Sequence, residues 1–311
     1  MKCLGLDIGH GDTKAFDGTR IISFPTVVSM AVDDGGFGGR SCVSVDNEKF
    51  YAGDDAQGES PWFDSRTSDF VGSSPWAAVL GKAIKDCGFN TFRNALVLGM
   101  PAAQYSREES EQLVSALKQK YITAGNGYRI NLCNADISIV PHGFGIFLKY
   151  VSDTKIKYRE LRIAVADIGY HTIDLIAIYK GAYLNDHAQS YPLGVSVLFD
   201  AIAKAFCSKY GLFITRKRAM DFIANRHVDW LGETYEIDNI ERIIRKYVAD
   251  VAAAINNYME GRKPDIGLAG GGGVYILRNL LKLKKRLAVV DEPESANAVG
   301  YWHYGILNQE D

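Results

Sequence analysis

The chain has 311 residues, of which 47% are hydrophobic and 23% charged, and its formal net charge is -2 at pH 7. This length exceeds what one hydrophobic core usually organises, so two domains or two similar halves are expected. The near-neutral charge gives no global attraction for polyanions, so no direct nucleic-acid binding is expected.

The cysteine pattern and the hydropathy also exclude several classes of protein. Five cysteines are widely spaced and form no CxxC or Cys/His cluster, which argues against a disulfide framework or a zinc site. No uncharged apolar run approaches the roughly 18 residues of a membrane span, and Asp7 interrupts the first apolar run, unlike a signal peptide. We therefore expect a cytoplasmic protein with no direct membrane contact.

The first half of the chain is predicted to begin with a β-meander and to continue as alternating strands and helices. A segment rich in Gly, Ser and Asp, residues 33–75, is expected to form a loop-rich excursion. Ser106 and Glu109 fit a capping box at the start of a helix. Strands are predicted at 2–8, 13–16, 20–24, 41–45, 49–52, 94–99 and 136–140, and helices at 76–88, 106–121 and from about Pro141.

A polar connector at 152–160 precedes a second half that repeats this plan. The clearest amphipathic helix is 238–260, with apolar residues at helical spacing. Strands are predicted at 161–167, 172–179, 265–269 and 287–290, and further helices at 194–211, 215–226, 274–283 and 294–307.

One short unit occurs in both halves: "LGLDIGHGDTKAFD" at 4–17 and "AVADIGYHTIDLIAI" at 164–178. A glycine-rich turn after a strand exposes successive backbone N–H groups that can surround phosphate oxygens. Asp7 and Asp167 would repel bare phosphate, but a divalent cation could bridge carboxylate and phosphate, directly or through water. The duplicated unit therefore predicts a Mg²⁺-nucleotide held between two facing loops.

A third element, "IGLAGGGGVYIL", places Gly270 to Gly273 between a strand and a helix. Four glycines exceed what a tight connection needs, and they allow a ligand to approach the backbone and a helix N-terminus.

Together these elements resemble the nucleotide-binding core of the actin, sugar-kinase and DnaK-chaperone superfamily, over essentially the whole chain. "DIGYHTIDLI" followed by "YPLGVSVLFDAIAKAF" is most similar to the plasmid-segregation actins of the ParM type and to the related Alp and archaeal actin-like proteins. The resemblance implies an α/β, actin-like (ribonuclease-H-like) fold with two similar domains around a nucleotide cleft. Domain I would span 1–160, with a small subdomain at about 25–75 and a C-terminal helix at about 294–311 packing back on it, and domain II would span 161–293, with a small subdomain at about 205–262.

The resemblance also implies roles for individual residues. Asp7 and Asp167 would position Mg²⁺, through water, and the attacking water molecule, while Lys14 and Thr172 would contact phosphate. The further nucleotide-binding candidates are Gly9, His10, Gly11, Asp12, Thr13, Gly169, Tyr170, His171, Lys217, Met220, Gly270, Gly271, Gly272, Gly273 and Tyr275.

His142 departs from the family pattern. Relatives usually carry Glu or Gln after the proline that opens the first connecting helix, where it orients the attacking water, whereas "IVPHGFG" has His142 at that place. A neutral imidazole could hold or deprotonate water, or His142 could simply begin the helix. Both interpretations stay open.

The implied function is an ATPase, with GTP as an alternative nucleotide, that polymerises with itself and whose filaments lose stability on hydrolysis. A DNA-binding adaptor protein would connect the filament to a segregated plasmid. Two alternatives remain: a small-molecule kinase or phosphohydrolase of the same fold, and a non-polymerising scaffold that changes shape with nucleotide. The basic run at 282–286 is interpreted as a solvated face.

Overall fold

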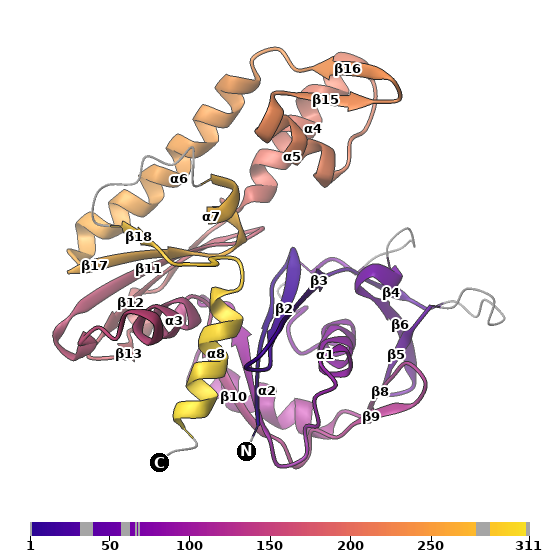
Figure 1. The fold of residues 1–311 in the computed structure, drawn as a ribbon, viewed down its shortest axis with the longest axis vertical. Coiled ribbons are helices and arrows are strands. Elements are labelled where there is room, and N and C mark those ends of the chain that lie inside the picture. The colour runs from indigo at the N-terminus through magenta and orange to yellow at the C-terminus, as the bar shows by residue number, and fades with distance from the viewer. Residues whose placement is uncertain are drawn as a thin grey trace.

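The computed structural model describes residues 2–31, 40–56, 63–65, 67, 69–277 and 287–308. Each half of the chain contains a mixed β-sheet, and the two sheets lie on either side of a pair of crossing helices (Figure 1). The N-terminal half carries a second sheet, and the C-terminal half carries a helical lobe with a β-hairpin.

The sheet of the N-terminal half contains β1 (Cys3–Ile8), β2 (Asp12–Phe16), β3 (Ile21–Pro25), β7 (Ala95–Met100) and β10 (Asp136–Pro141). Their order is β10-β7-β1-β2-β3. β1 is antiparallel to β2, as the Gly-containing turn requires, and parallel to β7. The predicted meander and the strands predicted at 94–99 and 136–140 are confirmed.

The sheet of the C-terminal half repeats this arrangement. It contains β11 (Arg162–Ile168), β12 (Ile173–Tyr179), β13 (Ala182–Tyr183), β17 (Ile266–Gly270) and β18 (Leu287–Val289), in the order β13-β12-β11-β17-β18, while β14 (Gln189–Tyr191) pairs with β12. β11 is antiparallel to β12 and parallel to β17. The duplication seen in the sequence is therefore a duplication of topology.

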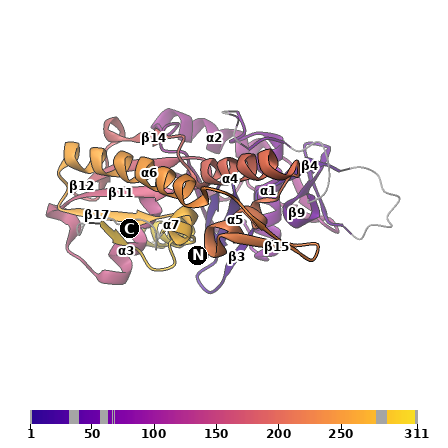
Figure 2. The ribbon, with the colours of Figure 1, turned by 90° about the horizontal axis from the view of Figure 1, so that it is seen from above.

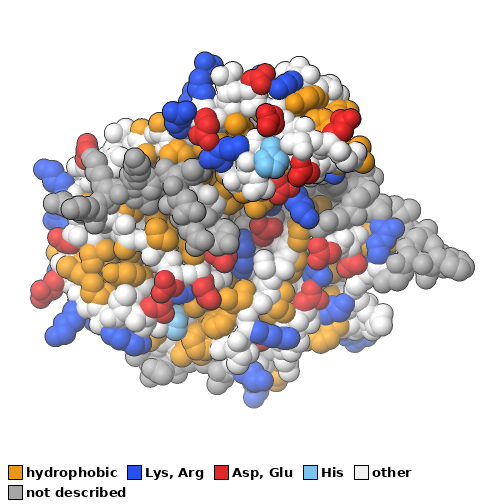
Figure 3. Space-filling model, turned by 45° about the horizontal axis from the view of Figure 1, so that its top comes forward, with side chains coloured by type: hydrophobic (Ala, Val, Ile, Leu, Met, Phe, Trp, Pro, Cys, Tyr) orange, Lys and Arg blue, Asp and Glu red, His pale blue; other side chains and the backbone are white. Residues whose placement is uncertain are grey.

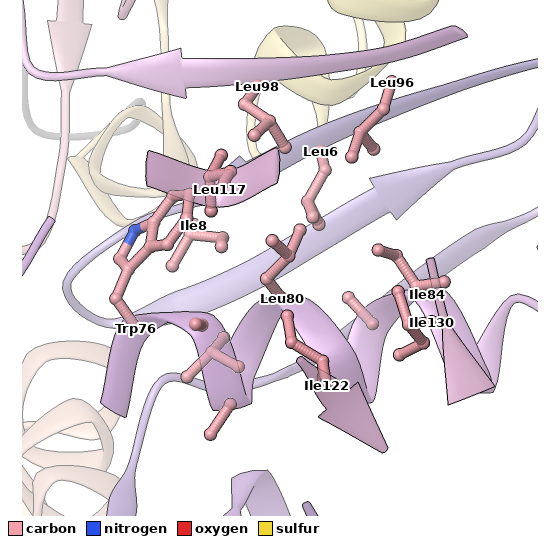
Figure 4. Packing of buried hydrophobic residues seen from close by; sticks show 14 of the residues in the cluster. Leu6, Ile8, Trp76, Leu80, Ile84, Leu96, Leu98, Leu117, Ile122 and Ile130 are labelled. Carbon is pink, nitrogen blue, oxygen red and sulfur yellow. The ribbon is translucent and has the colours of Figure 1, made fainter. Parts of the chain in front are cut away.

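A smaller sheet closes the N-terminal half around α1 (Ser74–Asp86). It contains β4 (Val28–Met30), β5 (Cys42–Val45), β6 (Glu48–Ala52), β8 (Ile122–Ala124) and β9 (Tyr128–Ile130). Leu80 and Ile84 of α1 pack between Leu6 of the main sheet and Ile122 of the small one (Figure 4). Two strands of this sheet, β8 and β9, lie outside the 25–75 segment to which the subdomain was assigned from the sequence.

Helix α2 (Arg107–Gln119) begins as the capping pattern predicts. The Ser106 hydroxyl accepts a hydrogen bond from the Glu109 backbone N–H at 3.1 Å. This bond satisfies one of the free amides in the first turn of the helix.

The lobe of the C-terminal half consists of α4 (Val195–Tyr210), α5 (Arg216–Asn225), the hairpin β15 (His227–Trp230) and β16 (Glu233–Glu236), and α6 (Ile240–Arg262). Helix α4 ends at Gly211, whose φ of +69° suits glycine, as predicted from the sequence. Figures 1 and 2 both show the lobe extending from its own sheet over the edge of the N-terminal half that carries β3. The hairpin was not predicted.

The two connecting helices, α3 (Phe144–Thr154) and α8 (Ala296–Leu307), cross with their backbones in contact. A Cβ on Gly300 would overlap the Gly145 carbonyl, and one on Gly145 would lie 2.7 Å from the Asn297 Cα, so both positions need glycine. Helix α3 starts later than predicted. Pro141 is the last residue of β10, because it still pairs with Met100 of β7, and Gly143 with φ +84° makes the turn.

Helix α7 (Gly272–Leu277) follows β17. Residues 278–286 lie outside the described residues. They include the end of the helix predicted at 274–283 and the whole basic run at 282–286. Within the described ranges, none of the helices combines the length and the hydropathy that a membrane span requires.

Candidate functional site

The two Asp-Ile-Gly loops face each other across one cleft of about 320 Å³. A Cβ on Gly11 of the first loop would lie 2.8 Å from the Tyr170 side chain of the second, so the loops are in van der Waals range only because Gly11 has no side chain. The rings of His10 and His171 meet edge to face with centroids 5.4 Å apart. Both halves of the chain therefore contribute to one site.

Asp7 and Asp167 are the penultimate residues of the two equivalent strands, β1 and β11, and both line the cleft. Burial raises the pKa of both carboxyl groups; the nearby Lys14 ammonium partly offsets this for Asp7, and the charge of Asp7 adds to it for Asp167. Two like charges held out of water are costly unless a cation joins them. The floor of the cleft is thus suited to bind a cation.

His142 lies in the turn between β10 and α3, with its imidazole between the two loops. Its Nε2 is 3.6 Å from Asp7 Oδ1 and its Nδ1 is 4.0 Å from Asp174 Oδ2. Burial lowers the pKa of His142 to about 4, so the ring is neutral at pH 7 and these contacts are not ion pairs. Nε2 is buried and makes no hydrogen bond to the described residues, so a ring nitrogen is free for a small ligand or a water molecule.

Asn297 of α8 ties the connecting helices to the second loop. Its Nδ2 donates to Asp167 Oδ2 at 2.7 Å, and its Oδ1 accepts from the Gly143 backbone N–H at 3.1 Å. The side chain is buried, with both polar atoms satisfied. Asp167 is therefore held in place by the helix that follows the last strand.

The third glycine element forms the wall beside Asp167. Gly271 has φ +88°, and a Cβ there would overlap both Asp167 Oδ1 and the Ile168 carbonyl. Gly272 begins α7 with open space around its Cα, so its backbone faces the cleft unobstructed. This wall suits a flat or phosphorylated group that approaches the backbone closely.

The residues opposite the two aspartates carry opposite charges. In β2, Lys14 pairs in register with Asp7, whereas in β12 it is Asp174 that pairs with Asp167. Burial raises the pKa of Asp174 to about 7, and the charge of Asp167 acts in the same direction. One of its oxygens, Oδ1, lacks a hydrogen-bond partner among the described residues.

A charged contact crosses the cleft mouth. Arg216 of α5 donates from a terminal nitrogen to Asp12 Oδ2 at 3.1 Å, and its guanidinium lies 4.4 Å from the centre of the Tyr170 ring. Lys14 Nζ is 3.9 Å from the same Asp12 oxygen. The helical lobe is thus linked to the first loop by a shared carboxylate.

Helix α4 fixes the second loop through the loop's own carbonyls. The backbone N–H groups of Val195 and Ser196 donate to the carbonyls of Gly169 and Tyr170 at 3.2 and 2.8 Å. Ser196 Oγ also lies 3.1 Å from His171 Nδ1. The first amides of α4 are therefore satisfied by the carbonyls of the second loop.

The structure brings most of the predicted site residues to this cleft. Its lining includes Asp7, Gly9, His10, Gly11, Asp12, Lys14, His142, Asp167, Gly169, Tyr170, Thr172, Met220, Gly271, Gly272 and Gly273.

Four predicted residues do not line the cleft. Thr13 points to the other face of β2, where its hydroxyl is 2.8 Å from that of Thr26, because strand residues alternate sides. His171 turns toward Ser196, Gly270 abuts Ile146, and Lys217 is exposed one residue beyond the cleft-facing Arg216. The side chain of Tyr275 lies outside the described part of the structure.

Several lining residues were not identified from the sequence, namely Ser23, Asp174, Val195, Arg216, Ile276, Glu294 and Asn297. Two of them carry a recognisable signal, since Asp174 is a charge inside an otherwise apolar strand and Asn297 is a polar residue on an apolar helix. Arg216 lies one position before the predicted Lys217. Considering which face of the helix points to the cleft could have identified Arg216 in place of Lys217.

Within the described ranges, no group of three or more His, Cys, Asp or Glu residues is arranged as a metal cage. This is compatible with a cation bound mainly by phosphate and water, which is how Mg²⁺ is usually held beside nucleotides.

Two family models match the sequence. The model of the N-terminal domain of actin-like proteins matches residues 5–145, and that of the C-terminal domain of archaeal MreB-like actin homologues matches residues 165–283. No curated protein sequence matches the chain.

Solved structures share the fold over their whole length. Ta0583, an archaeal actin homologue also solved in complex with ADP, superposes with a TM-score of 0.82 at 18% identity, covering 100% of both chains. A ParM protein from Clostridium botulinum, solved as a 15-stranded filament, superposes with a TM-score of 0.79 at 19% identity, covering 98% of this chain and 99% of that one. Bacillus thuringiensis ParM, solved with ATP, gives a TM-score of 0.69 at 17% identity, covering 100% of both chains. The chain belongs to the actin-like proteins and has their two-domain fold around a central cleft.

Proposed function

We propose that this protein is an ATPase of the actin-like family that assembles into filaments when it binds nucleoside triphosphate. The observation that carries the proposal is the pair of Asp-Ile-Gly loops facing each other across one cleft, with the Gly271–Gly273 wall beside them. A single triphosphate bound there would contact both halves of the chain, and its hydrolysis would remove part of that connection.

The proposed binding mode follows from the lining of the cleft. The backbones of Gly9 to Asp12 and Gly169 to Thr172 would surround the β- and γ-phosphates, and Lys14 would neutralise phosphate charge. The adenosine would lie against the glycine wall, with Met220 at its edge. GTP is an alternative nucleotide. None of the contacts described for the residues near that wall distinguishes adenine from guanine.

Hydrolysis requires charge stabilisation and a water molecule held in line with the scissile bond. Asp7 and Asp167 would orient the coordinating waters of Mg²⁺, the ion that would supply charge neutralisation at the phosphates. His142 fits the water-orienting role, because its ring is neutral and Nε2 has no hydrogen-bond partner among the described residues. Asp174, 4.0 Å from the other ring nitrogen, would fix the orientation of the imidazole.

Filament assembly and its cellular use are further parts of the proposal. Support comes from the fold shared with ParM proteins, one of which was solved as a filament. We propose that the filaments segregate DNA in the cytoplasm and that a DNA-binding adaptor connects them to a plasmid.

The proposal is tested by sedimentation and light scattering of the purified chain with ATP and Mg²⁺, compared with ADP and Mg²⁺. We expect assembly with ATP and weaker or transient assembly with ADP. A chain that stays monomeric with ATP at every concentration tried would contradict the filament function and favour an enzyme or a nucleotide-switched scaffold of the same fold.

An Asp167→Ala variant tests the catalytic part separately. We expect phosphate release to fall on the order of 100-fold or more, because the carboxylate that orients water at the phosphates is lost. Glu111→Ala, at an exposed position of α2, is the matched control and should keep full turnover. Full turnover by Asp167→Ala, with an unchanged circular dichroism spectrum, would show that Asp167 has no catalytic role.

A further inference from the structure

The tip of the β15–β16 hairpin presents an unusual residue to solvent. Leu231 and Gly232 form its two-residue turn, with φ of +54° and +82°. Turns of this kind favour Asn-Gly, because a leucine in the left-handed region costs about 1 to 2 kcal/mol. The Leu231 side chain is also 81% exposed. Neither the backbone nor the packing of the monomer explains a leucine at this position.

Side-chain contacts hold the hairpin that carries Leu231 at both of its ends. The Arg218 guanidinium lies 4.0 Å from the centre of the Trp230 ring, and Trp230 contacts the Phe206 and Tyr235 rings. The Tyr210 hydroxyl donates to the Glu236 carbonyl at 2.7 Å. The exposed leucine therefore projects from a rigid support, and we call it the Leu231 knob.

Acidic side chains surround the knob. Residues 227–238 contain Asp229, Glu233, Glu236 and Asp238 and no Lys or Arg. Lys209 pairs with Asp238 at 2.9 Å, and Arg218 of α5 lies over the Trp230 ring, so this end of the lobe carries more acidic than basic side chains. At the upper end of the molecule in Figure 3, orange apolar side chains lie among red acidic and blue basic ones.

A groove of about 350 Å³ lies at the far end of the C-terminal half. Its apolar surface comes from Ile178, Tyr179 and Leu184, and its cations are Arg162 and Arg262, while its described lining contains no Asp or Glu. The Arg262 Nε is buried and makes no hydrogen bond to the described residues. We call this site the Arg262 groove. It offers what the tip lacks, namely a basic rim around an apolar floor.

The knob and the groove lie at opposite ends of one helix. The hairpin immediately precedes α6. One side of the groove is formed by Gly261 and Arg262 in the last turn of α6 and by Pro264 just after it. Helix α6 has 23 residues, so the two sites are about 35 Å apart along a single rigid rod. Figure 1 shows α6 running from the hairpin to the edge of the sheet at β17.

We propose that the Leu231 knob of one copy inserts into the Arg262 groove of a second copy of this chain. Two complementary sites at opposite ends of the same rod make a head-to-tail contact that does not close, and this generates an open filament. The acidic tip and the basic rim attract each other and set the polarity of the contact. The inference rests on the proposed polymerisation and assigns residues to it.

The test is the critical concentration for assembly with ATP and Mg²⁺. Leu231→Asn supplies the residue that the turn prefers and removes the apolar knob, so the variant should fold at least as well as the wild type. We expect its critical concentration to rise at least about 10-fold, since a buried leucine contributes roughly 1.5 to 3 kcal/mol. Phe92→Asn, at an exposed apolar position of the other half, is the matched control and should assemble normally.

A charge exchange tests the partner site. Glu233→Arg and Arg262→Glu should each raise the critical concentration, and the double variant should recover assembly, because each tip then meets a groove of opposite charge. Wild-type assembly with undiminished assembly of Leu231→Asn would overturn this contact and leave the filament function intact. Failure of the wild type to assemble would overturn both.

Discussion

The two Asp-Ile-Gly loops occupy equivalent places in two sheets of the same topology, yet they differ in charge. The first aspartate faces Lys14 across its hairpin, and the second faces Asp174 at the same register position. The first loop therefore brings a cation to the cleft, and the second brings an additional acid whose pKa burial raises to about 7.

The loops also differ in how they are supported. The second is held by the N-terminus of α4, by Asn297 and by the close approach of Gly271. The first is held by contacts near its own hairpin, such as the bond from the Thr26 N–H to the Gly11 carbonyl at 3.0 Å. We propose that the side chains of the two loops differ in role, with Lys14 of the first strengthening phosphate binding and Asp174 of the second setting the reaction geometry.

The largest effects on turnover and on nucleotide binding are expected from substituting Asp174 and Lys14, each in a separate variant. Asp174→Asn should reduce turnover on the order of 1,000-fold without weakening nucleotide binding, because it removes an acid beside His142 and not a phosphate ligand. Lys14→Met should weaken ATP binding roughly 10- to 100-fold, with a smaller effect on turnover at saturation. Single-turnover hydrolysis and fluorescent-nucleotide titration measure the two effects. Equal losses of affinity in both variants would mean that the loops do not divide these roles.

This comparison also separates what was predictable from the sequence from what was not. Both loops could be predicted, because a glycine-rich turn after an apolar strand is a local property. The strands β8 and β9 could not, because each has three residues and Ala124 pairs with the distant Val43. Asn297 and Arg216 were missed for a related reason. A local signal marks both positions, but their roles depend on how α8 and α5 pack against the cleft.

A second experiment probes the support of the second loop. Gly271→Ala should lower the free energy of unfolding by about 2 to 4 kcal/mol, because alanine is strained at φ +88° and its Cβ overlaps Asp167 Oδ1. Gly272→Ala is the matched control, since nothing lies within 4 Å of its added Cβ. Urea unfolding of both variants makes the comparison. If the two variants unfolded alike, the close packing of Gly271 against Asp167 would not matter for stability.

The smallest effect concerns the contact that joins the two loops at the cleft mouth. Arg216→Gln removes the ion pair with Asp12 and the contact with the Tyr170 ring, both partly exposed. We expect the nucleotide-free protein to lose less than about 1 kcal/mol of stability, and less still near 1 M salt, because exposed charge pairs are screened. Lys217→Gln, one residue further along α5 and exposed, should change nothing. A large loss of stability that does not depend on salt would contradict this expectation, because charge attraction alone responds to ionic strength. Arg216 would then join the two loops by packing and not by its charge.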